Sequence, residues 1–177
     1  MTVLDNTPRQ LSMVSSGNKQ EIEKKIGEAL GLEMAAQKAV EELGSKGLLD
    51  KGGMNVKLES MRKQANNHQT QLEELIQRLS GSEGLDSANI QEVANETERK
   101  VSEIMKTYLG DQPDSSEAIE FLCLAEGGEV THYEVLKSVA KDVENKKFGR
   151  QVNTILGEEK RHLQLCTKLA KSNAASA

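Results

Sequence analysis

Aromatic residues, proline and cysteine are scarce in this chain of 177 residues, which has no Trp and only two each of Phe, Tyr, Pro and Cys. Because aromatic residues are enriched in strands, their scarcity argues against a β-rich fold. Lys, Glu, Ala, Leu and Gln are frequent instead, and these residues favour helices. The composition therefore predicts an all-α protein whose core consists of aliphatic side chains and Met.

The chain also lacks a basic stripe, a long apolar run and a start of signal-peptide type. Its net charge is −5 with both signs interspersed, which argues against nucleic-acid binding. No apolar stretch reaches the length that spans a membrane. Cys123 and Cys166 match no metal-binding or redox spacing, so we expect two reduced core thiols. These absences predict a cytoplasmic protein that binds neither nucleic acid nor membrane.

One helical domain accounts for most of the chain. We expect residues 1–17 to form a flexible arm, residues 18–172 a bundle and residues 173–177 a disordered tail. Apolar residues recur at helical spacing in five segments, over 19–43, 54–79, 87–109, 117–145 and 147–172. The third of these is about 35 Å long as a helix, which is enough to carry the chain from one end of the bundle to the other. Its candidate buried residues are Ile90, Val93, Val101, Ile104 and Tyr108.

All three histidines, His68, His132 and His162, fall on apolar stripes near the middle of an expected helix. Two of them close Glu-x-x-His units, Glu129-Val-Thr-His132 and Glu159-Lys-Arg-His162. A spacing of i, i+3 places the carboxylate and the imidazole on one helix face. Helix bundles build two-metal carboxylate sites from such units when several of them project inward at one level.

A polar residue therefore stands near the midpoint of four expected helices, with Glu33 at a core position of the first. In an antiparallel arrangement these residues share one layer. A dry layer of carboxylates and imidazoles would cost several kcal/mol for each unpaired buried charge. A divalent metal removes that cost, and oxygen and nitrogen ligands without thiolate suit iron, manganese or zinc. The alternative is a hydrated layer of salt bridges and hydrogen bonds without metal.

The segment 117–145 carries two neighbouring stripes, and Glu129 belongs to both. One stripe turns His132 inward, and the other turns Glu126 and Tyr133 inward. We therefore include Glu126 among the ligand candidates and expect Tyr133 to contact the ligands.

Two glycines, Gly127 and Gly128, interrupt the same segment and lower its helix stability by about 2 kcal/mol. They indicate either a close helix approach or π-bulge beside the site, or a loosely wound stretch.

With these residues in place, the chain resembles the ferritin-like superfamily over about residues 19–171. In that superfamily two antiparallel helix pairs are joined by a long crossover; the first and third helices each supply a Glu, and the second and fourth each supply a Glu-x-x-His. The stretches Ala125-Glu-Gly-Gly-Glu-Val-Thr-His-Tyr-Glu134 and Gly157-Glu-Glu-Lys-Arg-His162 are similar to those of rubrerythrins and of small bacterial stress-induced proteins. The chain has no Cys-x-x-Cys of a rubredoxin-like domain, which excludes a full rubrerythrin.

The resemblance implies a ferritin-like four-helix bundle with a long crossover that contains an additional helix. It also implies a di-iron or di-manganese centre, with zinc as a further candidate. The expected metal ligands are Glu33, His68, Glu126, Glu129, His132, Glu159 and His162. One position departs from the family, because Ala65 stands three residues before His68 where the family has Glu. Either the site is rearranged, with His132 compensating for this missing carboxylate, or it holds one metal ion, or it has lost metal.

The expected function is metal binding in the oxidative or stress response. If the metal site is intact, the resemblance implies oxidoreductase activity of the ferroxidase or peroxidase kind. We expect the partners to be metal ions and further copies of the chain, in a dimer or larger homo-oligomer. The alternative is a metal-free helical stress or scaffold protein that acts by self-association or partner binding.

Overall fold

The computed structural model describes residues 16–143 and 145–175. Over this part the chain is all-helical, with five α-helices and no strand, which confirms the predicted all-α class. The helices are α1 (Ser16–Ser45), α2 (Met54–Ser82), α3 (Ser87–Leu109), α4 (Ser115–Val139) and α5 (Lys146–Ala174). Two single-turn 3₁₀ helices lie at Lys51–Gly53, directly before α2, and at Ala140–Asp142, directly after α4.

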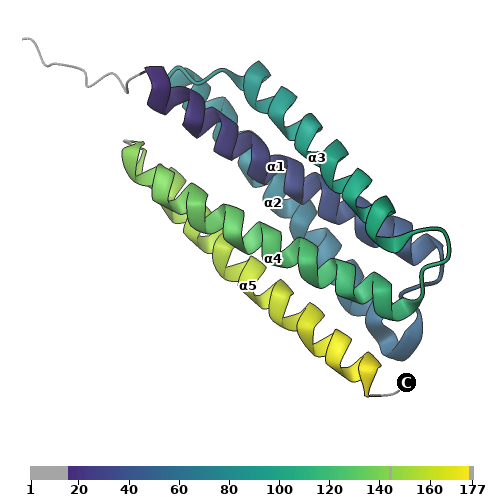
Figure 1. Cartoon of the computed structure of the whole chain (residues 1–177). Coiled ribbons are helices and arrows are strands. Elements are labelled where there is room, and N and C mark those ends of the chain that lie inside the picture. The colour runs from purple at the N-terminus through teal and green to yellow at the C-terminus, as the bar shows by residue number, and fades with distance from the viewer. Residues whose placement is uncertain (1–15, 144, 176–177) are drawn as a thin grey trace, which may run out of the picture.

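Successive helices reverse direction, so α2 and α4 run the same way along the long axis (Figure 1). Four helices surround the core, since α1 packs on α2 and α4, and α5 packs on α4 and α2. The remaining helix, α3, lies along the outside of α1 and returns the chain to the end of the bundle from which α4 starts. A long helical connection between the second and third core helices was the arrangement expected from residues 87–109.

Local sequence signals set the ends of these helices. Asp86 caps α3 by accepting hydrogen bonds from two backbone N–H groups, and Asp114 and Glu117 form a capping box at the start of α4. Asn145 caps α5 from an extended backbone conformation, so the preceding helix has to stop before it. For this reason α4 and its 3₁₀ turn end at residue 142, and not at residue 145 as predicted.

Helices continue into parts of the two segments that were predicted as a flexible arm and a disordered tail. Helix α1 already begins at Ser16, and α5 continues to Ala174. The remainder of the predicted arm, residues 1–15, and the last two residues of the predicted tail lie outside the described residues.

Two glycines let α1 and α3 approach closely. A Cβ atom at Gly27 would lie 2.7 Å from the backbone oxygen of Ile90, and one at Gly31 would lie 2.4 Å from the backbone oxygen of Ala94. Neither distance is compatible with a side chain, so the α1–α3 contact depends on both glycines. The contact is also fixed at one end by Glu23, whose buried carboxylate accepts hydrogen bonds from the Asp86 backbone N–H at 2.8 Å and the Asn89 amide at 2.9 Å.

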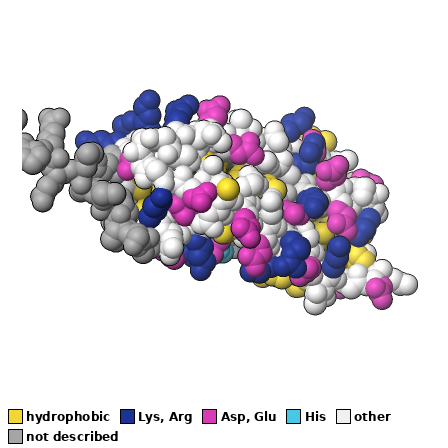
Figure 2. Space-filling view, turned by 90° about the horizontal axis from the view of Figure 1, so that it is seen from above, with side chains coloured by type: hydrophobic (Ala, Val, Ile, Leu, Met, Phe, Trp, Pro, Cys, Tyr) yellow, Lys and Arg dark blue, Asp and Glu magenta, His cyan; other side chains and the backbone are white. Residues whose placement is uncertain are grey.

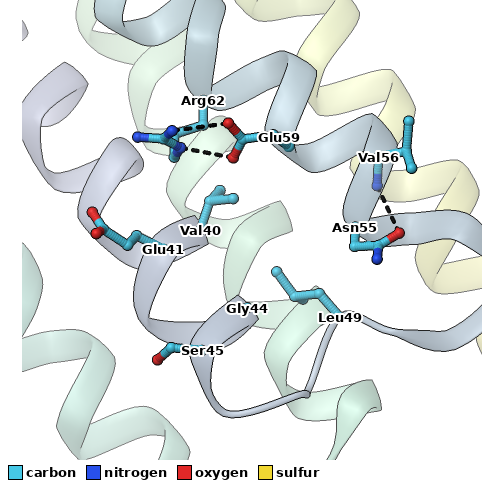
Figure 3. Close-up of a pocket in the computed structure, with 9 residues that line it drawn as sticks. All are labelled: Val40, Glu41, Gly44, Ser45, Leu49, Asn55, Val56, Glu59 and Arg62. Carbon is cyan, nitrogen blue, oxygen red and sulfur yellow. Dashed lines mark hydrogen bonds and ion pairs between the residues drawn. The ribbon is translucent and has the colours of Figure 1, made fainter.

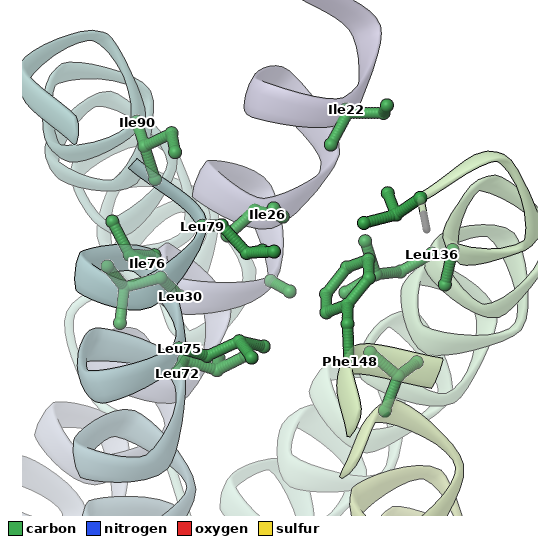
Figure 4. Close-up of a cluster of buried hydrophobic side chains, with 14 of the residues drawn as sticks. Ile22, Ile26, Leu30, Leu72, Leu75, Ile76, Leu79, Ile90, Leu136 and Phe148 are labelled. Atoms are coloured by element: carbon green, nitrogen blue, oxygen red, sulfur yellow. The ribbon is translucent and has the colours of Figure 1, made fainter. Parts of the chain in front are cut away.

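The hydrophobic core consists of two clusters. One fills the end of the bundle where α2 ends and α5 begins, and Figure 4 shows Leu72, Leu75, Leu79 and Phe148 converging there. The other lies toward the opposite end and includes Phe121. Each core helix contributes apolar residues to both clusters. The polar residues of its stripe lie between these two groups of apolar residues.

The predicted core stripes of three segments, 19–43, 54–79 and 147–172, are buried throughout. In 117–145 the stripe with Glu126 and Tyr133 is the buried one.

The third segment differs from its prediction. Ile104 and Tyr108 are exposed, and Val93 and Val101 are only half-buried, whereas Ile90 is buried as expected. The physical reason is the close α1–α3 approach, which selects one narrow face of α3. The buried residues of that face are Ile90, Ala94, Met105 and Leu109.

Gly127 and Gly128 lie inside the regular helix α4. A Cβ atom at either position would meet nothing within 4 Å, so the interpretation as a close helix approach is wrong. Both thiols are free as expected, with Cys166 buried and Cys123 half-buried.

The surface carries charges of both signs, which alternate over the face seen in Figure 2. Within residues 16–143 and 145–175, no helix combines the length and the apolar character that crossing a membrane requires.

Candidate functional site

Six polar side chains meet in one layer between the two hydrophobic clusters. Each is at most 5% exposed, and they come from all four core helices. They face inward because each one stands at a position of an apolar helical stripe where an apolar residue would otherwise be expected. The six residues are Glu33 on α1, His68 on α2, Glu126 and Glu129 on α4, and Glu159 and His162 on α5.

Three of them, Glu33, His68 and Glu159, form what we name the first triad. The Nδ1 atom of His68 lies 2.8 Å from Oε1 of Glu159 and 3.3 Å from Oε1 of Glu33. All three side chains are fully buried. Tyr133 closes the group from α4, because its hydroxyl donates a hydrogen bond of 2.6 Å to Oε1 of Glu33.

The second triad consists of Glu126, Glu159 and His162. Here Nδ1 of His162 lies 3.2 Å from Oε2 of Glu159 and 3.7 Å from Oε2 of Glu126. In each triad one ligand atom per residue can be chosen so that all three lie within 4.8 Å of one another. Each triad could therefore hold one metal ion, with two carboxylates and one imidazole as ligands.

Glu159 belongs to both triads and uses a different oxygen in each. Its Oε1 faces His68 and its Oε2 faces His162. The two imidazole rings lie 6.0 Å apart, centroid to centroid, on the two sides of this carboxylate. This is the arrangement in which one carboxylate can bridge two ions.

The outer nitrogen of each imidazole is held by a residue nearer the surface. Nε2 of His68 lies 2.5 Å from Oε2 of Glu158, and Nε2 of His162 lies 2.5 Å from Oε1 of Gln64. Both ring nitrogens of each histidine face oxygens, and the tautomer that donates from Nε2 to the outer oxygen is the one that suits a cation in the layer. In a neutral ring, the Nδ1 lone pair then points into the layer.

The electrostatics of the layer favour bound protons when no cation is present. Burial raises the pKa of Glu33 to about 7, and it also raises the pKa values of Glu126 and Glu129. For His68, burial lowers the pKa, but hydrogen bonds with Glu159 and Glu33 outweigh it and raise the pKa to about 11.

Glu159 differs from the other buried carboxylates. Burial raises its pKa, but hydrogen bonds from His162 and His68 outweigh this effect, and its pKa falls below the usual range. The carboxylate that both triads share is therefore the one that stays ionised most readily.

Four polar atoms inside the layer make no well-aligned hydrogen bond, although three of them lie within ion-pair distance of another triad residue. These buried atoms are Oε2 of Glu33, Nδ1 of His68, Oε2 of Glu126 and Oε1 of Glu159. Buried polar atoms are rarely left unpaired in proteins, and these four all belong to the triads. The donor set therefore fits a cation, which would satisfy carboxylate oxygens and a neutral imidazole nitrogen together.

Of the seven predicted ligands, the structure brings six together and leaves out His132. The His132 side chain is 38% exposed, its Nδ1 contacts the backbone oxygen of Gly128 at 2.9 Å, and its nearest carboxylate is that of Glu28 at 3.9 Å. The expectation that His132 compensates for Ala65 was therefore wrong. The physical reason is the register of α4, in which Tyr133 takes the inward position one residue further on.

Helix α4 turns two of the predicted ligands inward, Glu126 and Glu129, about one turn apart. Tyr133 contacts a ligand candidate, as expected.

Sequence reasoning missed Glu158 and Gln64. The available signal was spacing, because Gln64 precedes His68 by one turn on α2 and Glu158 precedes His162 by one turn on α5. Antiparallel helices bring such pairs opposite each other, and Gln71 and Gln151 continue the same polar seam with a hydrogen bond.

A hollow near the α1–α2 connection is unrelated to this layer. It measures about 430 Å³ and is bordered by the ion pair of Glu59 and Arg62 (Figure 3). No residue of either triad lines it. The layer is enclosed, and of the two residues that contact its imidazoles from outside, Gln64 is exposed and Glu158 is half-buried.

Fold and site together define the described chain as an all-helical bundle with a buried carboxylate–imidazole layer. Comparison with protein-family models, with curated proteins and with solved structures finds no match.

Proposed function

We propose that this chain is a metal-binding protein with a two-ion centre, one ion in each triad. The observation that carries the proposal is the position of Glu159, whose two oxygens face two imidazoles from two different helices. A structural salt bridge needs one such contact. A carboxylate that serves two triads is the arrangement that a bridged pair of ions requires.

Charge balance supports the proposal. Four carboxylates and two imidazoles are buried in one layer, where unpaired charge is costly. Four triad atoms make no well-aligned hydrogen bond, and Oε2 of Glu33 has no ion-pair contact either. Two divalent cations would match four carboxylates in charge and would accept the lone pairs of both Nδ1 atoms.

Oxygen and nitrogen ligands without thiolate favour iron or manganese, with zinc as a further candidate. We infer a ferritin-like arrangement from the direction of the helices, the long helical connection and the placement of the ligands on α1, α2, α4 and α5. A pair of iron or manganese ions would supply redox chemistry, which agrees with a role in the oxidative or stress response. The protein side chains would hold the ions, exclude water and keep protons at stated positions, such as the Tyr133 hydroxyl beside Glu33.

The test is metal stoichiometry. The chain is purified without chelator, stripped with EDTA, and titrated with Mn²⁺ in air and Fe²⁺ without oxygen. We expect about two ions per chain. Glu159→Gln removes the shared carboxylate charge and should reduce binding at both positions. Glu134→Gln, an exposed carboxylate paired with Lys160 on the same side of the bundle, is the matched control and should bind as the parent does.

Wild-type protein that binds neither ion, with a melting temperature unchanged by metal or EDTA, would contradict the proposal. The layer would then be a proton-bearing hydrogen-bond network, and the chain a metal-free helical scaffold.

A further inference from the structure

The structure points to unequal affinities at the two cation positions, set from outside the triads by Glu158 and Gln64. This inference rests on the proposed two-ion centre. We propose that Glu158 strengthens the first triad because it places a carboxylate against His68. Gln64 offers His162 only a neutral amide, so the second triad receives less support.

The contacts are alike in geometry and differ in charge. Each outer partner accepts a hydrogen bond from Nε2 of its imidazole at 2.5 Å. Each partner stands on the helix opposite its imidazole, so the α2–α5 seam holds one pair in each direction. The difference in chemistry, carboxylate against amide, is therefore the main variable between two otherwise matched pairs.

A carboxylate that accepts the outer N–H of an imidazole makes the inner nitrogen a better donor to a cation. The loss of such an outer partner typically reduces metal affinity 10- to 100-fold. A neutral amide orients the ring but adds no charge. We therefore expect the first triad to fill first as a cation is titrated in.

Both partners are positioning residues that can be exchanged without entering the core. Gln64 is exposed, and the Glu158 side chain is 30% exposed, with its other oxygen 3.6 Å from the guanidinium of Arg161. The substitutions Glu158→Gln and Gln64→Glu keep side-chain size and exchange charge for amide. Arg161→Gln removes the other neighbour of Glu158 and leaves the His68 contact in place.

Tyr133 offers a readout that belongs to one position only. Its hydroxyl donates to Glu33, a ligand candidate of the first triad alone. Tyrosine fluorescence is quenched by a hydrogen-bonded carboxylate, so a cation that takes Glu33 should raise it. The chain has no Trp and two Tyr, so the background Tyr108→Phe leaves Tyr133 as the sole reporter.

The experiment titrates the full chain in this background with Zn²⁺ in a buffered series, following Tyr133 fluorescence and, in parallel, total binding by calorimetry. In the parent we expect the fluorescence to change with the first equivalent. Glu158→Gln should shift its midpoint to about 10- to 100-fold higher free Zn²⁺. Gln64→Glu should leave that midpoint in place and move the second binding event to lower free Zn²⁺.

The double exchange Glu158→Gln with Gln64→Glu should invert the order, so that the fluorescence changes with the second equivalent. A merely structural role of the two residues would not produce this inversion. Arg161→Gln should leave the midpoint within about threefold of the parent. If Glu158→Gln fails to fold by circular dichroism, Glu158→Asp, which keeps the charge but shortens the reach, should shift the midpoint in the same direction.

A folded Glu158→Gln variant whose fluorescence midpoint stays within about threefold of the parent overturns the inference while the two-ion centre stands. A parent chain that binds no Zn²⁺, Mn²⁺ or Fe²⁺ overturns both.

Discussion

At the scale of single residues, the layer depends on donors placed against buried carboxylates. Tyr133 is the plainest case, because it is buried completely and its hydroxyl donates only to Glu33. The carboxyl of Glu33 already has its pKa raised to about 7 by burial. Without the hydroxyl, a buried oxygen would lose its partner.

Tyr133→Phe should therefore destabilise the metal-free protein by about 1–3 kcal/mol, the usual cost of a buried group left unpaired. The measurement is urea unfolding in EDTA near pH 7, followed by circular dichroism. Tyr108→Phe is the control, because Tyr108 is 42% exposed, and it should change stability by less than about 0.5 kcal/mol. Equal stability of the two variants would show that the hydroxyl adds nothing to the layer.

At the scale of elements, the position of α3 depends on two glycines of α1 and on the hydrogen bonds that Glu23 of α1 accepts from residues at the start of α3. A side chain at Gly31 would meet the backbone of Ala94, which cannot rotate away as a side chain can. The helix would have to move outward, and the α1–α3 contact would open.

Gly31→Ala should destabilise the protein by about 1–3 kcal/mol through overpacking, against a gain of about 1 kcal/mol in helix propensity. Gly127→Ala is a matched control, since it makes the same change inside a helix where the space is open. That control should stabilise the protein by up to about 1 kcal/mol. Thermal and urea unfolding of both variants decides the question, and a stabilised Gly31→Ala would mean that α3 is not held at this distance.

At the scale of the whole molecule, stability and metal binding are linked through the protons of the layer. In the metal-free protein the pKa of Glu33 is raised from 4.5 to about 7, and that of His68 from 6.5 to about 11. A group with a raised folded pKa stabilises fully below its unfolded pKa, and this contribution is lost as the pH rises through its folded pKa. The metal-free protein should therefore lose stability between pH 5.5 and 8.

Cation binding has the opposite dependence, because the ligands have to release their protons. The melting-temperature difference between Mn²⁺-loaded and EDTA-treated protein should widen from pH 5.5 to pH 8. With metal at about 100 times its dissociation constant, the difference should be on the order of 5–10 °C. Scanning calorimetry across this range is the check, and a difference that shrinks with pH would contradict the linkage.

The sequence by itself predicted the five helical segments, the buried stripes of three of them and the six residues of the layer, together with a seventh candidate, His132, that lies outside it. It could do so because apolar periodicity is a local property, and a Glu or His on such a stripe stands out against it. For Glu33, His68 and Glu159, position along the helix was enough to place them at one level.

Only the tertiary structure decided the rest. The register of α4 turned Glu126 and Tyr133 inward and His132 outward, a difference of one residue that two equally apolar stripes could not resolve. The narrow buried face of α3 was set by the close approach of α1. The opposition of Glu158 to His68 and of Gln64 to His162 arises from the pairing of α2 with α5, and contacts between residues about 90 positions apart leave no periodic trace in the chain.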